Sequence, residues 1–182
     1  FMGPLERFFL GEDNIRITSY HFSETSKLTE KLQCNVFMCE CTPPDKHGYM
    51  NFGPVGAFNN HQVIQGADTV IVQVNSRTPY IYGTQNFVHV DDVDIICEKD
   101  HELPGIPEIP IAEEERRIAS IIVDRVPDGA TLQIGIGGLG NAIGYLLENK
   151  KDLGVHTEMF TDSMVALVKK GVITCKKKTF HP

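Results

Sequence analysis

Residues Thr131–Asp162 read TLQIGIGGLGNAIGYLLENKKDLGVHTEMFTD and decide the fold. A short apolar run, Leu132 to Ile136, enters a cluster of glycines, and a helical run follows it. A second short extended run then carries a lone carboxylate, Glu158. This order of strand, glycine turn, helix and acid-bearing strand predicts a βαβ unit that can hold a phosphorylated or thioester ligand near the carboxylate.

Helical and strand-like runs alternate over the rest of the chain, which predicts an α/β fold with mostly parallel strands flanked by helices. The apolar β-branched run Thr69–Val74 is typical of a strand buried on both faces of a parallel sheet. Further strands are expected at Ile15–Thr18, Cys34–Cys39 and Val93–Ile96. A first helix is expected at His61–Ala67, ending at Gly66. A second is expected at Glu113–Val126, with an apolar stripe made of Ile118, Ile121, Ile122 and Val126. A third is expected at Asp162–Lys170, with Asp162 as N-cap and Gly171 at its end, and its inward residues are Met164, Val165, Leu167 and Val168.

A linker is expected between two domains. The sequence LPGIPEIP at 103–110 contains three prolines and a glycine, and such a stretch cannot continue a helix or a central strand. We therefore predict one domain at 1–103, a Pro-rich linker at 104–112 and a second domain at 113–182.

Composition excludes several classes of function. A net charge of −7 argues against nucleic acid as a partner, because phosphate binding needs a basic face. The sequence contains no apolar run long enough to span a bilayer and no signal-peptide pattern, so we expect a cytoplasmic protein without a membrane partner. Its five cysteines lack a regular spacing, and although Cys39 and Cys41 share a strand face, no further metal-ligand motif accompanies them. We predict reduced thiols and no metal site.

The glycine cluster leaves two interpretations open at this point. Gly135-x-Gly137-x-x-Gly140 satisfies the dinucleotide fingerprint, and Glu158 lies near the position of a ribose-binding acid, which would indicate an NAD-binding oxidoreductase. However, the second strand is short and polar, and the unit comes late in the chain. The additional glycine, Gly138, exposes backbone that suits an oxyanion or a thioester carbonyl equally well.

Several dispersed segments resemble the acetyl-CoA hydrolase/transferase family, specifically the 4-hydroxybutyrate and butyryl-CoA:acetate CoA-transferases. These segments are LQIGIGGLGNAIGYLL at 132–147, DLGVHTEM at 152–159, GVIT at 171–174, KKKT at 176–179, TPPDKHGYMNFG at 42–53, and VQVN at 72–75 followed by Pro79 and Gly83. Two departures stand out: relatives place Ile-Pro where this chain has Leu139-Gly140, and the stretch between Phe22 and Cys34 is shorter. The resemblance implies a CoA-transferase-like (NagB/RpiA-like) two-domain architecture. Because family members are much longer, we expect this chain to cover the end of the N-terminal domain and the start of the C-terminal one.

The resemblance also implies a mechanism. Glu158 would be the nucleophile that attacks an acyl-CoA thioester and later carries CoA as a glutamyl thioester. Gln133 and the glycines Gly135, Gly137 and Gly138 are the candidate oxyanion- and CoA-binding residues. Coenzyme A would be a substrate, and the acyl group would be 4-hydroxybutyryl, butyryl or acetyl, exchanged with a short-chain carboxylate such as acetate.

His47 and Tyr49, in a Pro-rich turn, and Asn75, at the end of a strand, are candidate substrate-site residues in the other predicted domain. A homo-oligomer is left open by the sequence. So is a third interpretation, in which the 182-residue chain is an inactive piece that only folds or associates.

Overall fold

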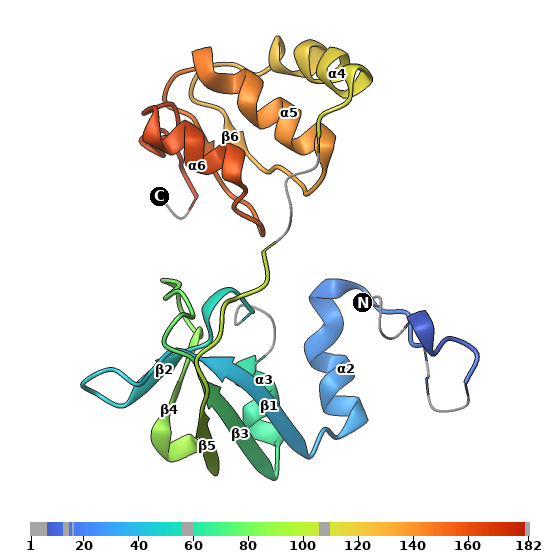
Figure 1. Ribbon diagram of the computed structural model, residues 1–182, viewed down its shortest axis with the longest axis vertical. Coiled ribbons are helices and arrows are strands. Elements are labelled where there is room, and N and C mark those ends of the chain that lie inside the picture. The colour runs from blue at the N-terminus through green and yellow to red at the C-terminus, as the bar shows by residue number, and fades with distance from the viewer. Residues whose placement is uncertain (1–6, 13–14, 16, 56–59, 106–109, 181–182) are drawn as a thin grey trace. The chain divides into compact units, whose positions relative to one another are not determined.

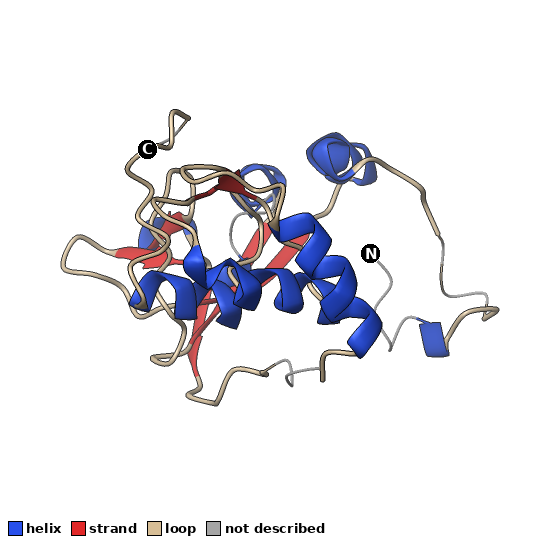
Figure 2. Ribbon diagram, turned by 90° about the horizontal axis from the view of Figure 1, so that it is seen from above, coloured by secondary structure: helices blue, strands red, loops and turns tan. Residues whose placement is uncertain are grey.

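The computed structural model describes residues 7–12, 15, 17–55, 60–105 and 110–180. The chain forms two compact units, Phe1–Pro104 and Gly105–Pro182, hereafter the first and the second unit. Helices, strands and loops alternate along the chain, as expected for an α/β fold (Figure 2).

The first unit contains a parallel sheet and an antiparallel pair (Figure 1). Its elements are η1 (Phe22–Glu24), α2 (Thr25–Leu32), β1 (Val36–Cys41), β2 (Tyr49–Asn51), η2 (Gly53–Val55), α3 (Asn60–Gly66), β3 (Thr69–Val74), β4 (Phe87–His89), η3 (Val90–Asp92) and β5 (Ile95–Glu98), with η denoting a 3₁₀ helix. The sheet has the order β1-β3-β5, so β3 is its central strand, while β2 pairs with β4.

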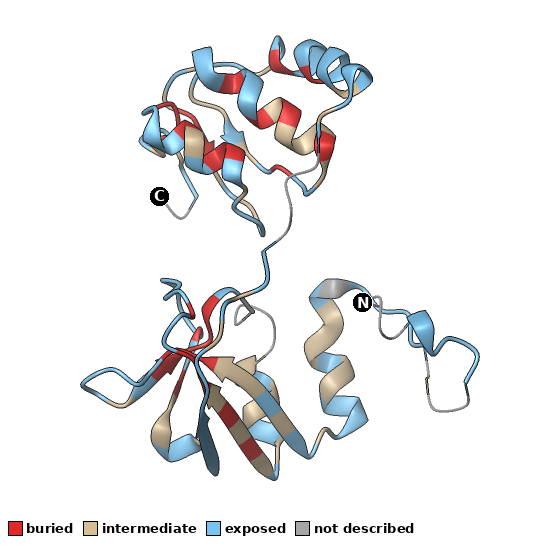
Figure 3. Ribbon diagram, in the orientation of Figure 1, coloured by how far each residue is buried: buried red, intermediate tan, exposed pale blue. Residues whose placement is uncertain are grey.

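One face of the parallel sheet carries the core of the first unit. Val70, Val72 and Val74 of β3 are buried, whereas the residues between them are only half-buried (Figure 3). The buried valines pack with Met50 and Phe52, which lie in and just after β2. The predicted bounds and parallel pairing of β3 are therefore confirmed. The prediction that both faces are buried is wrong within this unit, because its core covers one face only.

A hydrogen-bonded network joins the carboxyl ends of β1, β3 and β5. Glu40 of β1 accepts hydrogen bonds from the Thr78 hydroxyl at 2.8 Å and from the Asn75 amide at 3.1 Å. His101, which follows β5, places its Nε2 2.6 Å from the same carboxylate. Partial desolvation raises the pKa of Glu40, but the hydrogen bonds from Thr78, Asn75 and His101 outweigh it and hold that pKa below its ordinary value.

The second unit is built around α5 (Gly138–Leu146) and a short parallel pair of strands, β6 (Thr131–Leu132) and β7 (Gly154–Val155). The other elements are α4 (Glu113–Val123), η4 (Leu147–Asn149) and α6 (Asp162–Lys169). Its buried core takes side chains from α4, η4, α6 and the segments between elements: Val123, Ile134, Leu147, Leu153, Met164, Leu167, Val172 and Ile173. Both predicted strands of the βαβ unit are present, but each contributes only two residues to the paired ladder. After β6 the chain soon enters the glycine loop, which ends the pairing on that side.

The predicted inward faces of α4 and α6 are partly wrong. Ile118, Ile121 and Ile122 of α4 are exposed, and the residues that face α5 are Ala119 and Val123. The physical reason is that α4 packs mainly on α5. One row of residues spaced four apart, Ala119 and Val123, is enough to form that helix–helix contact. The helix also ends at Val123, three residues earlier than predicted.

In α6, Met164 and Leu167 are buried as predicted, whereas Val165 and Val168 are exposed. Its N-cap is Thr161, so Asp162 is the first helical residue and not the cap. Gly171 ends the helix with a φ of 73°, a conformation that favours glycine.

The remaining sequence predictions for the first unit have mixed outcomes. The strand expected at Cys34–Cys39 forms two residues later, as β1, and the one expected at Val93–Ile96 forms as β5. The expected helix at His61–Ala67 is confirmed as α3, ending at Gly66. The strand expected at Ile15–Thr18 is wrong, because Ile15, Ile17 and Thr18 lie in irregular chain; residue 16 lies outside the described residues.

The Glu40 network predicts a pH-dependent stability. Since the pKa of Glu40 is lowered on folding, its contribution is present above the ordinary value of 4.5 and is lost as the pH falls through the lowered pKa. Glu40→Gln should reduce the free energy of unfolding at pH 7 by roughly 1–3 kcal/mol, because it replaces charge-assisted hydrogen bonds. Urea unfolding of wild-type and variant protein at pH 7 and pH 3 measures this, and the difference between them should shrink at pH 3. Glu98→Gln, at an exposed position of β5, is the matched control and should change little.

Candidate active site

The pairing of β6 with β7 sets the geometry of the predicted site. Thr131 pairs with Gly154 and Leu132 with Val155, a constant separation of 23 residues. The ladder continues with a hydrogen bond from the His156 amide to the Leu132 carbonyl at 2.9 Å. Beyond the strands, the Thr157 hydroxyl lies 3.5 Å from the Ile134 carbonyl oxygen, again 23 residues apart, and Glu158 and Gly135 are the next residues of the two segments. The predicted acid and the glycine loop thus leave the sheet side by side, at the carboxyl ends of two parallel strands, where open α/β folds place ligands.

Thr157 connects the segment that carries Glu158 to the segment that carries the glycines. Its hydroxyl lies 3.5 Å from the carbonyl oxygen of Ile134, the residue before Gly135, and 3.1 Å from that of Met159. Glu158 itself lies in an exposed bend between β7 and α6. The Glu158 carboxylate is therefore accessible to a ligand, while the hydrogen bond from the Thr157 hydroxyl to the Met159 carbonyl fixes the backbone on both sides of it.

The four glycines of the loop divide into two kinds. A Cβ added at Gly135 or Gly137 would meet no atom within 4 Å, so both positions open onto free space. By contrast, a Cβ at Gly138 would collide with the Glu115 carboxylate, and one at Gly140 would collide with the Gly135 carbonyl. The Gly135 backbone therefore excludes a side chain at Gly140, and the mobile end of Glu115 lies where a side chain at Gly138 would be. No atom of the unit lies where a side chain at Gly135 would be.

Gly137 has a conformational reason to be glycine. Its φ is 129°, and it forms the N-cap of α5 without a side-chain hydrogen bond. This conformation turns the chain from β6 into the helix. Gln133, the other predicted member of this group, is exposed between β6 and the buried Ile134.

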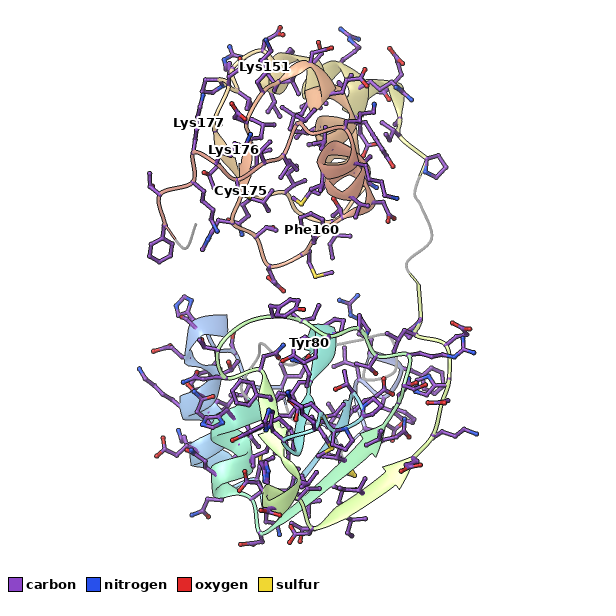
Figure 4. All side chains as sticks on the ribbon, turned by 90° about the vertical axis from the view of Figure 1, so that its left-hand side faces the viewer. Tyr80, Lys151, Phe160, Cys175, Lys176 and Lys177 are labelled. Atoms are coloured by element: carbon purple, nitrogen blue, oxygen red, sulfur yellow. The ribbon has the colours of Figure 1, made fainter. Side chains whose placement is uncertain are left out.

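Exposed apolar side chains stand near Glu158 and Gly135 along the chain. Ile136 is 60% exposed and Phe160 54% exposed, and Met159 is also exposed. Phe160 lies at the surface of the second unit in Figure 4. These side chains can supply apolar contacts to a ligand that reaches Glu158.

The basic run Lys176–Lys178 lies mainly elsewhere on this unit. Lys177 is 3.9 Å from Asp152, and its side chain packs over Gly129, just before β6. Lys151 and Lys177 are thus near the amino ends of β6 and β7, away from Phe160 (Figure 4). The positive charge of Lys177 is not placed beside the glycine loop.

His47 lies in the turn before β2, and Tyr49 is the first residue of that strand. The Asp45 carboxylate accepts hydrogen bonds from the backbone amides of His47, at 2.8 Å, and Tyr49, at 3.0 Å. The bonds from Tyr49 and His47 hold the pKa of Asp45 below its usual range. The Tyr49 ring contacts the rings of Phe87 and His89 edge-on. Both predicted residues are exposed, so their side chains are available to a ligand.

Asn75 is fully buried in the network at the strand ends. Its amide nitrogen donates to Glu40 and to the His101 carbonyl, and its amide oxygen accepts from the backbone of Arg77 at 3.0 Å. The side chain of Asn75 therefore serves the fold of the first unit, where it ties β1 and β3 to the segment after β5.

Sequence reasoning missed two groups of residues. Thr157 gave a signal, because a hydroxyl directly before the acid can anchor it. Glu40 and His101 gave none, since they are 61 residues apart and become neighbours only through the parallel sheet. Among the described residues, no cluster of three or more His, Cys, Asp or Glu side chains could hold a metal. The described helices also include none that is long and apolar enough to cross a membrane.

The chain is similar in sequence to proteins of one known family. The acetyl-CoA hydrolase/transferase N-terminal domain matches residues 14–107. The 4-hydroxybutyrate coenzyme A transferase of Clostridium kluyveri is 36% identical over the whole chain, which spans 42% of that protein. The butyryl-CoA:acetate CoA-transferase of Anaerostipes caccae is 37% identical over 97% of the chain, which spans 41% of its length.

Solved structures agree with these sequence relatives. RipA from Yersinia pestis superposes with a TM-score of 0.88 at 34% identity, covering 99% of this chain and 44% of RipA. The 4-hydroxybutyrate CoA-transferase from Porphyromonas gingivalis gives a TM-score of 0.84 at 34% identity, covering 97% of this chain and 46% of that structure. The α/β fold, the position of the glycine loop and these matches lead to one conclusion: the chain belongs to the acetyl-CoA hydrolase/transferase family.

Proposed function

We propose that the protein carrying this chain is a CoA-transferase. It moves CoA between an acyl-CoA (4-hydroxybutyryl-, butyryl- or acetyl-CoA) and a short-chain carboxylic acid such as acetate. The observation that carries the proposal is the parallel pairing of β6 with β7 together with the Thr157 hydroxyl 3.5 Å from the Ile134 carbonyl, because Glu158 follows Thr157 and Gly135 follows Ile134. The relatives support it, because three of those compared above are named as CoA-transferases.

Each unit has its own role in this proposal. The first unit corresponds to the end of the N-terminal CoA-transferase domain and the second to the start of the C-terminal one, with the Pro-rich linker at 104–112 between them. Glu158 and the glycine loop belong to the second unit, whereas His47 and Tyr49 belong to the first. We keep His47 and Tyr49, whose side chains are exposed, as candidate substrate-site residues of the first unit and leave buried Asn75 to the fold.

The reaction proceeds in balanced covalent steps. The Glu158 carboxylate attacks the thioester carbonyl, a C–O bond forms, and the C–S bond breaks to give a mixed anhydride and CoA thiolate. The thiolate then attacks the Glu158 carbonyl of the anhydride, which releases the first carboxylate and leaves a glutamyl-CoA thioester. A second carboxylate reverses these steps and leaves as its CoA ester, so the kinetics are ping-pong.

The open glycines suit the charge that develops in these steps. Each attack places negative charge on a carbonyl oxygen, which backbone N–H groups stabilise without adding a competing nucleophile. Gly135 and Gly137 face free space and allow this close approach, whereas Gly138 is covered by Glu115. We therefore assign the oxyanion contact to Gly135 and Gly137, with exposed Gln133 beside them, and assign Gly138 to support of the loop.

The two other interpretations make different predictions. An NAD-binding oxidoreductase requires nicotinamide-cofactor binding that depends on Gly135 or Gly137, and the relatives do not favour it. An inactive folding or association piece would show no turnover as the isolated 182-residue chain, whereas the complete protein would be active under the present proposal.

Loss of the nucleophile should abolish transfer. Glu158→Gln and Glu158→Ala should each lower kcat by at least about a thousandfold, because neither side chain can form the anhydride. The assay measures acyl-CoA formation from acetate and a donor acyl-CoA in the complete protein. Glu148→Gln, at a surface glutamate that pairs with Lys170, is the control and should retain the wild-type rate. Full activity in Glu158→Gln would contradict the assignment.

The glycines should separate activity from stability. Gly135→Ala should change the free energy of unfolding by less than about 0.5 kcal/mol, because its Cβ meets open space. It should nevertheless lower kcat/KM at least about tenfold by blocking the ligand, a loss of roughly 1.4 kcal/mol in transition-state binding. Gly140→Ala should instead destabilise the protein by about 1–3 kcal/mol, since its Cβ would strike the Gly135 carbonyl. Thermal unfolding and steady-state kinetics together test this difference, and equal behaviour of the two variants would refute it.

A further inference from the structure

Glu115 is a carboxylate on the packed face of α4. It precedes Ala119 and Val123 by one and two helical turns, and both of those residues are buried against the rest of the second unit. Its neighbours Glu113 and Glu114 are exposed, whereas Glu115 is half-buried. A charged group on the inward row of a helix is costly unless it meets a compensating partner.

The partners of Glu115 lie at the starts of two helices. Its Oε2 accepts a hydrogen bond from the Ala112 amide at 2.8 Å, which caps α4. Its carboxyl carbon lies 2.7 Å from the point where a Cβ on Gly138 would be, and both carboxylate oxygens face the same point. Gly138 is the first residue of α5, so Glu115 brings a negative charge from one helix to the first turn of another.

This first turn has no acid of its own. Residues Gly138–Leu146 contain no acidic residue in the first turn, and the N-cap, Gly137, makes no side-chain hydrogen bond. The free amides and the dipole give such a helix start a positive potential, which commonly binds phosphate groups. In this unit the Glu115 carboxylate already lies against that position.

We propose that Glu115 is a specificity-determining residue that keeps phosphate groups away from the start of α5. The inference rests on the proposed function and deepens it: the glycine loop receives the uncharged thioester end of the acyl-CoA, at Gly135 and Gly137, while the CoA pyrophosphate binds elsewhere. It also explains in physical terms why a dinucleotide fingerprint does not make a pyrophosphate site here, because a fixed negative charge repels a second one at short range.

Inorganic pyrophosphate is the probe that tests this role. Isothermal titration calorimetry on the complete protein should show that Glu115→Gln, which keeps the shape and removes the charge, binds pyrophosphate at least tenfold more tightly than wild type. Glu114→Gln, one residue away and exposed, is the matched control and should bind like wild type. Glu115→Ala is a second neutral variant and should behave like Glu115→Gln, while Glu115→Asp keeps the charge and should not gain affinity.

A second readout links the role to turnover. Pyrophosphate should inhibit transferase activity of Glu115→Gln at concentrations that leave wild type unaffected, and Gly135→Ala should weaken that inhibition if the anion lies over the loop. Equal pyrophosphate affinity in wild type and both neutral variants would overturn the proposal, as would an equal gain in Glu115→Asp. Because calorimetry does not require catalysis, this outcome is separable from failure of the CoA-transferase assignment, which the Glu158 variants report.

Discussion

The parallel pairing of β6 with β7 is the constraint on which the candidate site depends. Only two residues of each strand pair, yet the pairing starts the glycine loop and the segment that carries Glu158 from neighbouring strand ends. The Thr157 hydroxyl extends the connection by one more contact, to the Ile134 carbonyl. A shift of one residue would turn alternate side chains to the opposite face, so the buried Ile134 and Leu153 help to fix the register.

Packing and ligand access are separated within one short loop. The Gly135 carbonyl excludes a side chain at Gly140, and the flexible end of Glu115 lies where a side chain at Gly138 would be. Gly137 is a glycine because its φ of 129° requires it. Gly135 has no such reason, and under the proposed function the approach of the thioester is the reason. The first unit also separates residues that support the fold from residues that a ligand can reach. Asn75 is buried and hydrogen-bonded to Glu40, whereas His47 and Tyr49 are exposed.

Sequence patterns predicted the parts of this fold that depend on local order along the chain. The α/β class, the central strand Thr69–Val74, helix α3 and the glycine turn follow from periodicity and glycine placement, and the structure confirms them. Facing directions were harder: Ile118, Ile121 and Ile122 form an apolar stripe, but tertiary packing selected the Ala119 row instead. The Glu40–His101 pair and the contact of Glu115 with Gly138 could not be predicted, because each joins segments that are distant in sequence.

The central claim is that CoA becomes covalently attached to the Glu158 carboxylate. The most direct test is to incubate the complete protein with an acyl-CoA, treat it with hydroxylamine, and locate the resulting hydroxamate by mass spectrometry of its peptides. The account predicts a single hydroxamate, on Glu158, that appears only after exposure to acyl-CoA. A hydroxamate on another residue, or unmodified Glu158 in a protein that still exchanges CoA, would contradict it.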